Sequence, residues 1–134
     1  MSRIMIVEDD TLIAESMRVA LTSAGHEVVV LPQIEPVIDS MRQKLPDLVI
    51  LDLMFPGNKS GGFDLARSIR AEFKERKDLP ILMLSAVNQV YHMGFTPDDI
   101  DDEWMPVTDF MEKPVEPELL KTKVAELLAK KKKK

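Results

Sequence analysis

Cysteine is absent from the chain, and histidine is rare, with two among 134 residues. Without cysteine there are no disulfide bonds and no thiolate metal sites, which suits a protein of the reducing cytoplasm. His26 and His92 have no ligand partners at metal-site spacing, so we expect both histidines to be surface residues. A zinc site built from cysteine or histidine is therefore not expected.

Long apolar runs are also absent, and none approaches the roughly 20 residues that a membrane helix needs. The apolar stretch that follows Arg3 is short and acids follow it at once, which excludes a signal peptide. Hydrophobic residues make up 45% of the chain and charged residues 31%, as in soluble globular proteins. We therefore expect a cytoplasmic protein whose folded domain makes no membrane contact.

The charge of the chain is uneven along its length. The net charge is −5, but residues 130–134 are all lysine, so the remainder stands at −10. An acidic body argues against direct nucleic-acid binding by this domain. We expect one domain over residues 1–129 and a disordered, solvated lysine tail over residues 130–134. A weak contact of the tail with a membrane, nucleic acid or acidic partner, or an origin in expression, stays open.

Short apolar strands alternate with amphipathic helices along the chain. Strands are predicted at residues 4–7, 28–31, 47–51, 81–84 and 107–111. Helices are predicted at about residues 11–24, 36–45, 63–73, 96–104 and from 117 onward. The first helix should bury a stripe of apolar residues: Ile13, Met17, Ala20, Leu21 and Ala24. The last helix should do the same with Leu119, Leu120, Val124, Leu127 and Leu128.

This alternation predicts an α/β fold with a parallel sheet covered by helices on both faces. Right-handed crossovers leave few topologies, and a doubly wound, flavodoxin-like sheet of five strands in the order 2-1-3-4-5 fits this length. In such a sheet the site lies beyond the carboxyl ends of the strands, where the strand order reverses between the first and third strands. Asp9 and Asp52 would be neighbours there.

Polar side chains follow four of the predicted strands. These residues are Glu8, Asp9 and Asp10 after the first strand, Asp52 after the third, Ser85 after the fourth and Lys113 after the fifth. An ionised carboxylate at the end of a buried strand is costly unless something pairs with it. Parallel strands would bring acids, a hydroxyl and an ammonium group to one edge, which indicates a site for a metal ion and a phosphoryl group.

The motifs at these strand ends resemble the receiver domain of bacterial response regulators, the chemotaxis-regulator-like proteins. They are Val7-Glu8-Asp9-Asp10, Asp52-Leu53-Met54-Phe55-Pro56, Ser85-Ala86 and Lys113-Pro114. The resemblance spans residues 3–128. Each motif is common alone, but four in this order, each at a strand end, are specific. Taken singly, the acids after the first strand could cap a helix, and the other residues could be ordinary turn or surface groups.

The resemblance implies a role for each residue at the metal site. Asp52 would be the phosphoacceptor, forming an acyl phosphate. Asp9, Asp52 and the main-chain carbonyl of Met54 would bind Mg²⁺, and Glu8 would act through a bound water. Such a protein is a phosphoacceptor that supports its own phosphorylation and dephosphorylation, and it is not an enzyme with an external substrate.

The resemblance also implies a switch. Lys113 would pair with Asp52 and then with a phosphate oxygen, and Ser85 would donate a hydrogen bond to another phosphate oxygen. Phe110 would be the switch aromatic that moves inward with Ser85. The surface formed by the fourth helix, fifth strand and fifth helix would respond to phosphorylation. A histidine kinase or phosphotransfer protein would be the donor, the downstream target is unspecified, and a homodimer could form through the switching surface.

The chain departs from the family pattern in two loops, at residues 57–62 and between Ser85 and Lys113, both longer than usual. The fourth helix therefore cannot be copied from the family, and neither can partner choice. Met54 and Val87 are apolar where the family controls access of water to the phosphate, which predicts a slowly decaying phosphorylated state. The chain is either a stand-alone receiver or a part of a longer protein.

Two alternatives remain at this stage. A receiver fold could serve as an interaction module that works without phosphorylation, which the altered fourth-helix region favours. A small haloacid-dehalogenase-like phosphatase also places acids after its first strand and uses Mg²⁺. That family would need an aspartate nucleophile at the position of Glu8, and it would carry a cap insertion that is absent here.

Overall fold

The computed structural model describes residues 2–52, 61–76, 78–85, 109–112 and 115–132. The strands are β1 (Arg3–Val7), β2 (Glu27–Leu31), β3 (Leu48–Asp52), β4 (Ile81–Ser85) and β5 (Asp109–Glu112). The helices are α1 (Thr11–Ser23), α2 (Val37–Gln43), α3 (Gly61–Glu72) and α5 (Pro117–Lys132). The helix predicted at residues 96–104 lies outside the described residues.

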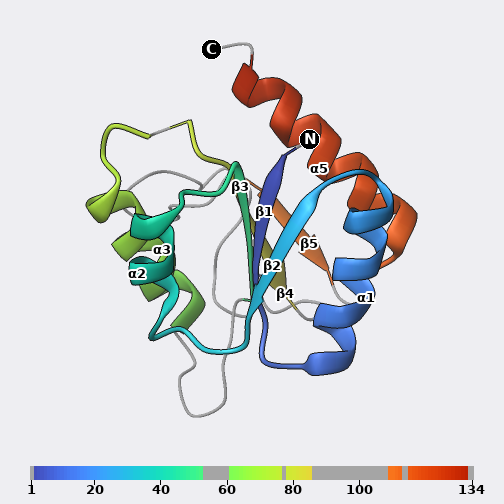
Figure 1. Ribbon diagram of the computed structural model, residues 1–134, viewed down its shortest axis with the longest axis horizontal. Coiled ribbons are helices and arrows are strands. Elements are labelled where there is room, and N and C mark those ends of the chain that lie inside the picture. Colours follow the sequence, from blue (N-terminus) through green and yellow to red (C-terminus); the bar gives the residue numbers. More distant parts are fainter. Residues whose placement is uncertain (1, 53–60, 77, 86–108, 113–114, 133–134) are drawn as a thin grey trace.

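The five strands form one parallel sheet in the order β2-β1-β3-β4-β5. Figure 1 shows α2 and α3 on one face of this sheet and α1 and α5 on the other. The predicted doubly wound α/β fold and its strand order are therefore confirmed.

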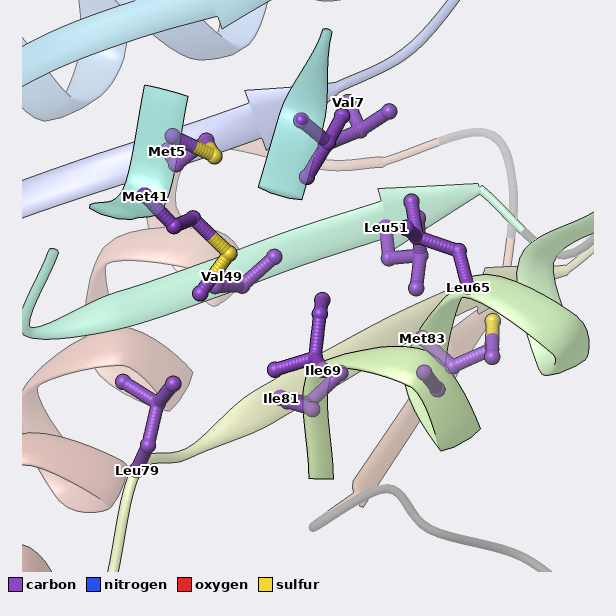
Figure 2. Packing of buried hydrophobic residues seen from close by; sticks show 12 residues of the cluster. Met5, Val7, Met41, Val49, Leu51, Leu65, Ile69, Leu79, Ile81 and Met83 are labelled. Carbon is purple, nitrogen blue, oxygen red and sulfur yellow. The ribbon is translucent and has the colours of Figure 1, made fainter. Parts of the chain in front are cut away.

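Alternate residues along each strand supply two separate cores, because successive side chains in a strand point to opposite faces. One core joins the sheet to α2 and α3, and Figure 2 shows it; its buried members include Met5, Val7, Val49, Leu51, Ile69 and Met83. The other joins the sheet to α1 and α5, with Ile4, Ile6, Ile50, Leu84, Leu120 and Val124 among its members. The continuous apolar runs in the sequence are thus divided between two faces.

The outer strands are less enclosed than the central ones. The described residues of β3 are all buried, whereas those of the edge strand β2 are partly or fully exposed. An edge strand has a neighbour on one side only, so its backbone and side chains keep some contact with solvent. The central strands, which lead to the predicted site, are therefore the most completely buried.

Several positions differ from the sequence-based predictions. Leu119 is 60% exposed, because the buried stripe of α5 runs through Leu120, Val124 and Leu127, and Leu119 lies about 100° around the helix from it.

Ala24 is exposed and stands after the end of α1, where Gly25 adopts φ 94°. His26 is partly buried rather than a surface residue, since the chain turns back there into β2. His92 lies outside the described residues.

The last described helix reaches into the lysine-rich end of the chain. Helix α5 continues to Lys132, three residues into the segment expected to be a disordered tail, and Lys133 and Lys134 lie outside the described residues. Among the helices that the structure describes, none has the length and apolar character needed to span a membrane.

Candidate functional site

The strand register brings the ends of β1, β3 and β4 to one edge of the sheet. Val7 pairs with Leu51, and Asp52 pairs with Leu84. The residue that follows Val7, Glu8, donates its backbone N–H to the carbonyl of Leu31 at the end of β2, with 3.2 Å between nitrogen and oxygen. The acids after β1 and the acid that ends β3 therefore share the edge where the strand order reverses.

Three carboxylates converge at this edge. One oxygen from each of Glu8, Asp9 and Asp52 lies within 4.8 Å of the others. Glu8 is 1% exposed and Asp52 is 5% exposed, while Asp9 is half-buried. Asp9 and Asp52 are thus the neighbours that the sequence predicted.

The third acid of the triplet after β1 has a different task. The carboxylate of Asp10 accepts hydrogen bonds from the backbone N–H groups of Leu12 and Ile13, at 3.0 and 3.1 Å, and so caps the amino end of α1. The simpler interpretation of the acids, helix capping, therefore holds for Asp10, whereas Asp9 joins the cluster.

The composition of the cluster indicates what it can bind. Carboxylates this close repel one another, and burial removes the water that would screen them. A bound cation offsets both effects. All three groups offer oxygen atoms, the ligand type that hard cations such as Mg²⁺ prefer. Asp9 keeps partial contact with solvent. The three acids thus form an acidic pocket consistent with a metal site.

The other predicted site residues are placed unequally. Ser85 ends β4 and pairs in register with Glu112, so its backbone lies at the same edge as the acids. Phe110 pairs with Met83 and packs, partly buried, against the core beneath α2 and α3. Lys113, Met54 and Val87 lie outside the described residues, and the roles expected for them stay predictions.

One ion pair near the predicted switch was not foreseen. Lys123 of α5 donates to the Oδ2 atom of Asp109 in β5 at 2.8 Å, and Oδ1 of Asp109 accepts the backbone N–H of Phe110 at 2.8 Å. The hydrogen bond to Asp109 raises the pKa of Lys123 above its usual value. Sequence offers no periodic or motif signal for this contact between a strand and the helix that follows it.

Comparison with known proteins agrees with this geometry. The family model described as "Response regulator receiver domain" matches residues 4–125. The transcriptional regulatory protein AfsQ1 of Streptomyces coelicolor is 31% identical over 131 residues, which cover 96% of this chain and 52% of that protein. The DNA-binding response regulator MtrA of Mycobacterium tuberculosis is 37% identical over 84 residues, which cover 63% of this chain and 34% of that protein. The chain thus spans about half the length of these relatives, or less.

Solved structures agree as well. A putative response regulator from Chloroflexus aurantiacus has a TM-score of 0.77 and 32% identity, with 96% of this chain and 98% of that chain covered. A CheY-like receiver domain protein from Methanospirillum hungatei has a TM-score of 0.79 at 23% identity, with coverage of 99% and 98%, and supports the fold alone. The acidic cluster lies where the order of the 2-1-3-4-5 sheet reverses, and the family model matches nearly the whole chain. The chain therefore belongs to the response regulator receiver domains of two-component signalling.

Proposed function

We propose that this domain accepts a phosphoryl group on Asp52 from a phosphohistidine, in a reaction that depends on Mg²⁺. The observation that carries the proposal is the convergence of Glu8, Asp9 and Asp52 within 4.8 Å, with the carboxylate of Asp52 at the end of a fully buried strand. The donor would be a histidine kinase or a phosphotransfer protein, the usual partners of receiver domains.

The transfer is a displacement at phosphorus. A carboxylate oxygen of Asp52 attacks and forms the new O–P bond, while the P–N bond to the donor's imidazole breaks. The electron pair of that bond stays on the imidazole nitrogen. The ring leaves as neutral imidazole when its other nitrogen carries a proton, and otherwise the freed nitrogen takes a proton from solvent. The product is an acyl phosphate on Asp52, which water can later hydrolyse.

The acids of the cluster would prepare Asp52 for this attack. Asp9 and Asp52, with the main-chain carbonyl of Met54, would bind Mg²⁺ directly, and Glu8 would act through a water. Bound Mg²⁺ would supply positive charge that lets an anionic phosphoryl donor approach an anionic nucleophile. Burial of Glu8 and Asp52 fixes their positions, so little reorganisation is needed when the donor docks.

The response to phosphorylation would pass through β5. Lys113 and Ser85 would hold the phosphate oxygens, and Phe110 would move further into the core beneath α2 and α3, where it is already partly buried. The resulting change would be displayed on a surface that includes β5, α5 and the expected fourth helix. That surface would contact a downstream target or a second copy of the domain.

Incubation with Mg²⁺ and acetyl phosphate, followed by intact-mass measurement, tests the proposal. The unmodified sequence should gain the mass of one phosphoryl group, and Asp52→Asn should gain none. Asp39→Asn is the matched control, because Asp39 is an exposed acid of α2 that pairs with Arg42 and is not a member of the cluster. Absence of a gain in every protein would instead favour an interaction module that works without phosphorylation. The phosphatase alternative has no support from the comparisons, which match the receiver family.

The lifetime of the acyl phosphate is a second prediction. Met54 and Val87 are apolar at the two sequence positions where the family controls the approach of water, so hydrolysis should be slow. Loss of labelled phosphate from the purified protein, followed over time with Mg²⁺ present, measures the lifetime. Decay within seconds would contradict the assignment of these two positions.

A further inference from the structure

Asp10 makes two sets of hydrogen bonds that link α1 to the acidic cluster. Its carboxylate caps α1 through the N–H groups of Leu12 and Ile13. Its own backbone N–H donates to the Oε2 atom of Glu8, with 3.2 Å between nitrogen and oxygen. One residue therefore contacts both the first turn of the helix and one of the buried acids.

The connection between β1 and α1 leaves these groups little freedom. Residues 8–10 join the strand to the helix, and Glu8 is anchored by its backbone hydrogen bond to Leu31. Asp10 has φ −78° and ψ 110°, the extended backbone that an N-cap residue adopts. The N–H that donates to Glu8 belongs to the same residue whose side chain caps α1, so the position of the donor depends on the cap.

We propose that Asp10 is a positioning residue for the magnesium site, in which capping of α1 holds the backbone N–H that orients the carboxylate of Glu8. This inference rests on the proposed function of the cluster. The carboxylate of Asp10 is itself turned to the helix, so it acts through Glu8 and not as a ligand. Groups that hold metal-binding side chains in place typically change metal affinity by about 10–100-fold when they are lost.

Three variants separate positioning from charge and from stability. Asp10→Ala removes the cap and the charge, while Asp10→Asn keeps a good cap and removes the charge. Glu116→Ala is the control, because the carboxylate of Glu116 caps α5 in the same way, accepting from the N–H groups of Glu118 and Leu119 at 3.3 and 3.1 Å. Calorimetric titration with MgCl₂ alone measures affinity, and the Tm in EDTA measures stability.

The expected pattern is specific. Asp10→Ala should weaken Mg²⁺ binding by about tenfold, and Asp10→Asn should stay within about twofold of the unmodified sequence. Asp10→Ala and Glu116→Ala should each lower the Tm by about 4 °C, but Glu116→Ala should leave Mg²⁺ affinity unchanged.

Three results would overturn the inference while leaving the proposed function intact. The first is an unchanged Mg²⁺ affinity in Asp10→Ala. The second is an equal loss of affinity in Asp10→Asn and Asp10→Ala, which would assign the effect to charge. The third is an equal loss of affinity in Glu116→Ala, which would assign the effect to general stability. If the unmodified sequence bound no Mg²⁺, the proposed function and this inference would both be wrong.

Discussion

At the scale of single residues, three consecutive acids leave β1 and reach three different surroundings. Glu8 is buried, Asp9 is half-buried in the cluster and Asp10 is exposed at the start of α1. Their side chains are chemically alike, so the backbone path from strand to helix decides which of them repel Asp52. Crowding of carboxylates that is useful for binding a cation should reduce stability when no cation is present.

Asp9→Asn tests this tension between binding and stability. Removal of one of three neighbouring negative charges should raise the free energy of unfolding in EDTA by about 1 kcal/mol. The same substitution should weaken Mg²⁺ binding at least about tenfold, because a direct ligand loses its charge. Urea denaturation in EDTA and titration with MgCl₂ measure the two effects. A variant that is less stable in EDTA than the unmodified sequence would contradict the repulsion that we infer.

His26 should make stability depend on pH. Burial lowers the pKa of His26 below its ordinary value, and its Nδ1 atom is buried without a hydrogen-bond partner among the residues that the structure describes. The folded protein therefore binds this proton less readily than the unfolded chain. The stabilising contribution is present above pH 6.5 and is lost as the pH falls toward the folded-state pKa.

The corresponding measurement is urea denaturation between pH 7.5 and pH 5, with His26→Gln as the comparison. The unmodified sequence should lose stability over this interval, and His26→Gln should lose less. The carboxylates of Glu27 and Glu72 have pKa values lowered by hydrogen bonds to Arg3 and Arg42, so their effects come below about pH 4.5. Parallel pH profiles for the two proteins would contradict the assignment to His26.

At the scale of helices and strands, buried apolar contacts rather than ion pairs hold α2 and α3 on the sheet. Arg42 of α2 donates to both carboxylate oxygens of Glu72 in α3, at 2.8 and 3.1 Å, but both side chains are largely exposed. Exposed pairs contribute about 0–1 kcal/mol. Ile69 of α3 is fully buried in the core between these helices and the sheet.

Ile69→Ala should therefore destabilise the domain by about 2–5 kcal/mol, because the truncation removes buried contacts and leaves a cavity. Arg42→Ala should cost much less, because an ion pair exposed to solvent contributes little to stability. Urea denaturation of the two variants at neutral pH compares the effects. An Arg42→Ala loss as large as that of Ile69→Ala would show that the ion pair, and not the core, fixes these helices.

Periodicity predicted these elements well where apolar patterns extend over several turns. The run from Leu48 to Leu51 marks a strand buried on both faces, and the strand order followed from the alternation of strands and helices. The predicted burial of Leu119 was wrong, because one step along a helix turns a side chain by about 100°. The predicted burial of Ala24 was wrong, because α1 ends one residue earlier than expected.

The site was predictable in its location but not in its detail. Parallel strands must end at one edge, so the meeting of Asp9 and Asp52 followed from the fold. The sequence offered helix capping for these acids, but it did not decide which of them would cap α1 and which would join the cluster. The pairing of Lys123 with Asp109 likewise depends on how α5 lies across β5.

At the scale of the whole molecule, the fold converts distant sequence positions into one site. β1 and β3 are adjacent in the sheet although a helix, a strand and another helix separate them in the chain. The acids that follow or end these strands meet because the sheet is parallel and its order reverses there. The proposed function therefore requires that Asp52, and no other carboxylate, receives the phosphoryl group.

Reductive mapping of the acyl phosphate tests this claim most directly. The domain is incubated with Mg²⁺ and acetyl phosphate, treated with borohydride, which reduces an aspartyl phosphate to homoserine, and digested for tandem mass spectrometry. The account predicts homoserine at position 52, and none there when EDTA replaces Mg²⁺. Homoserine at another aspartate with position 52 unchanged, or equal labelling at position 52 in EDTA, would contradict it.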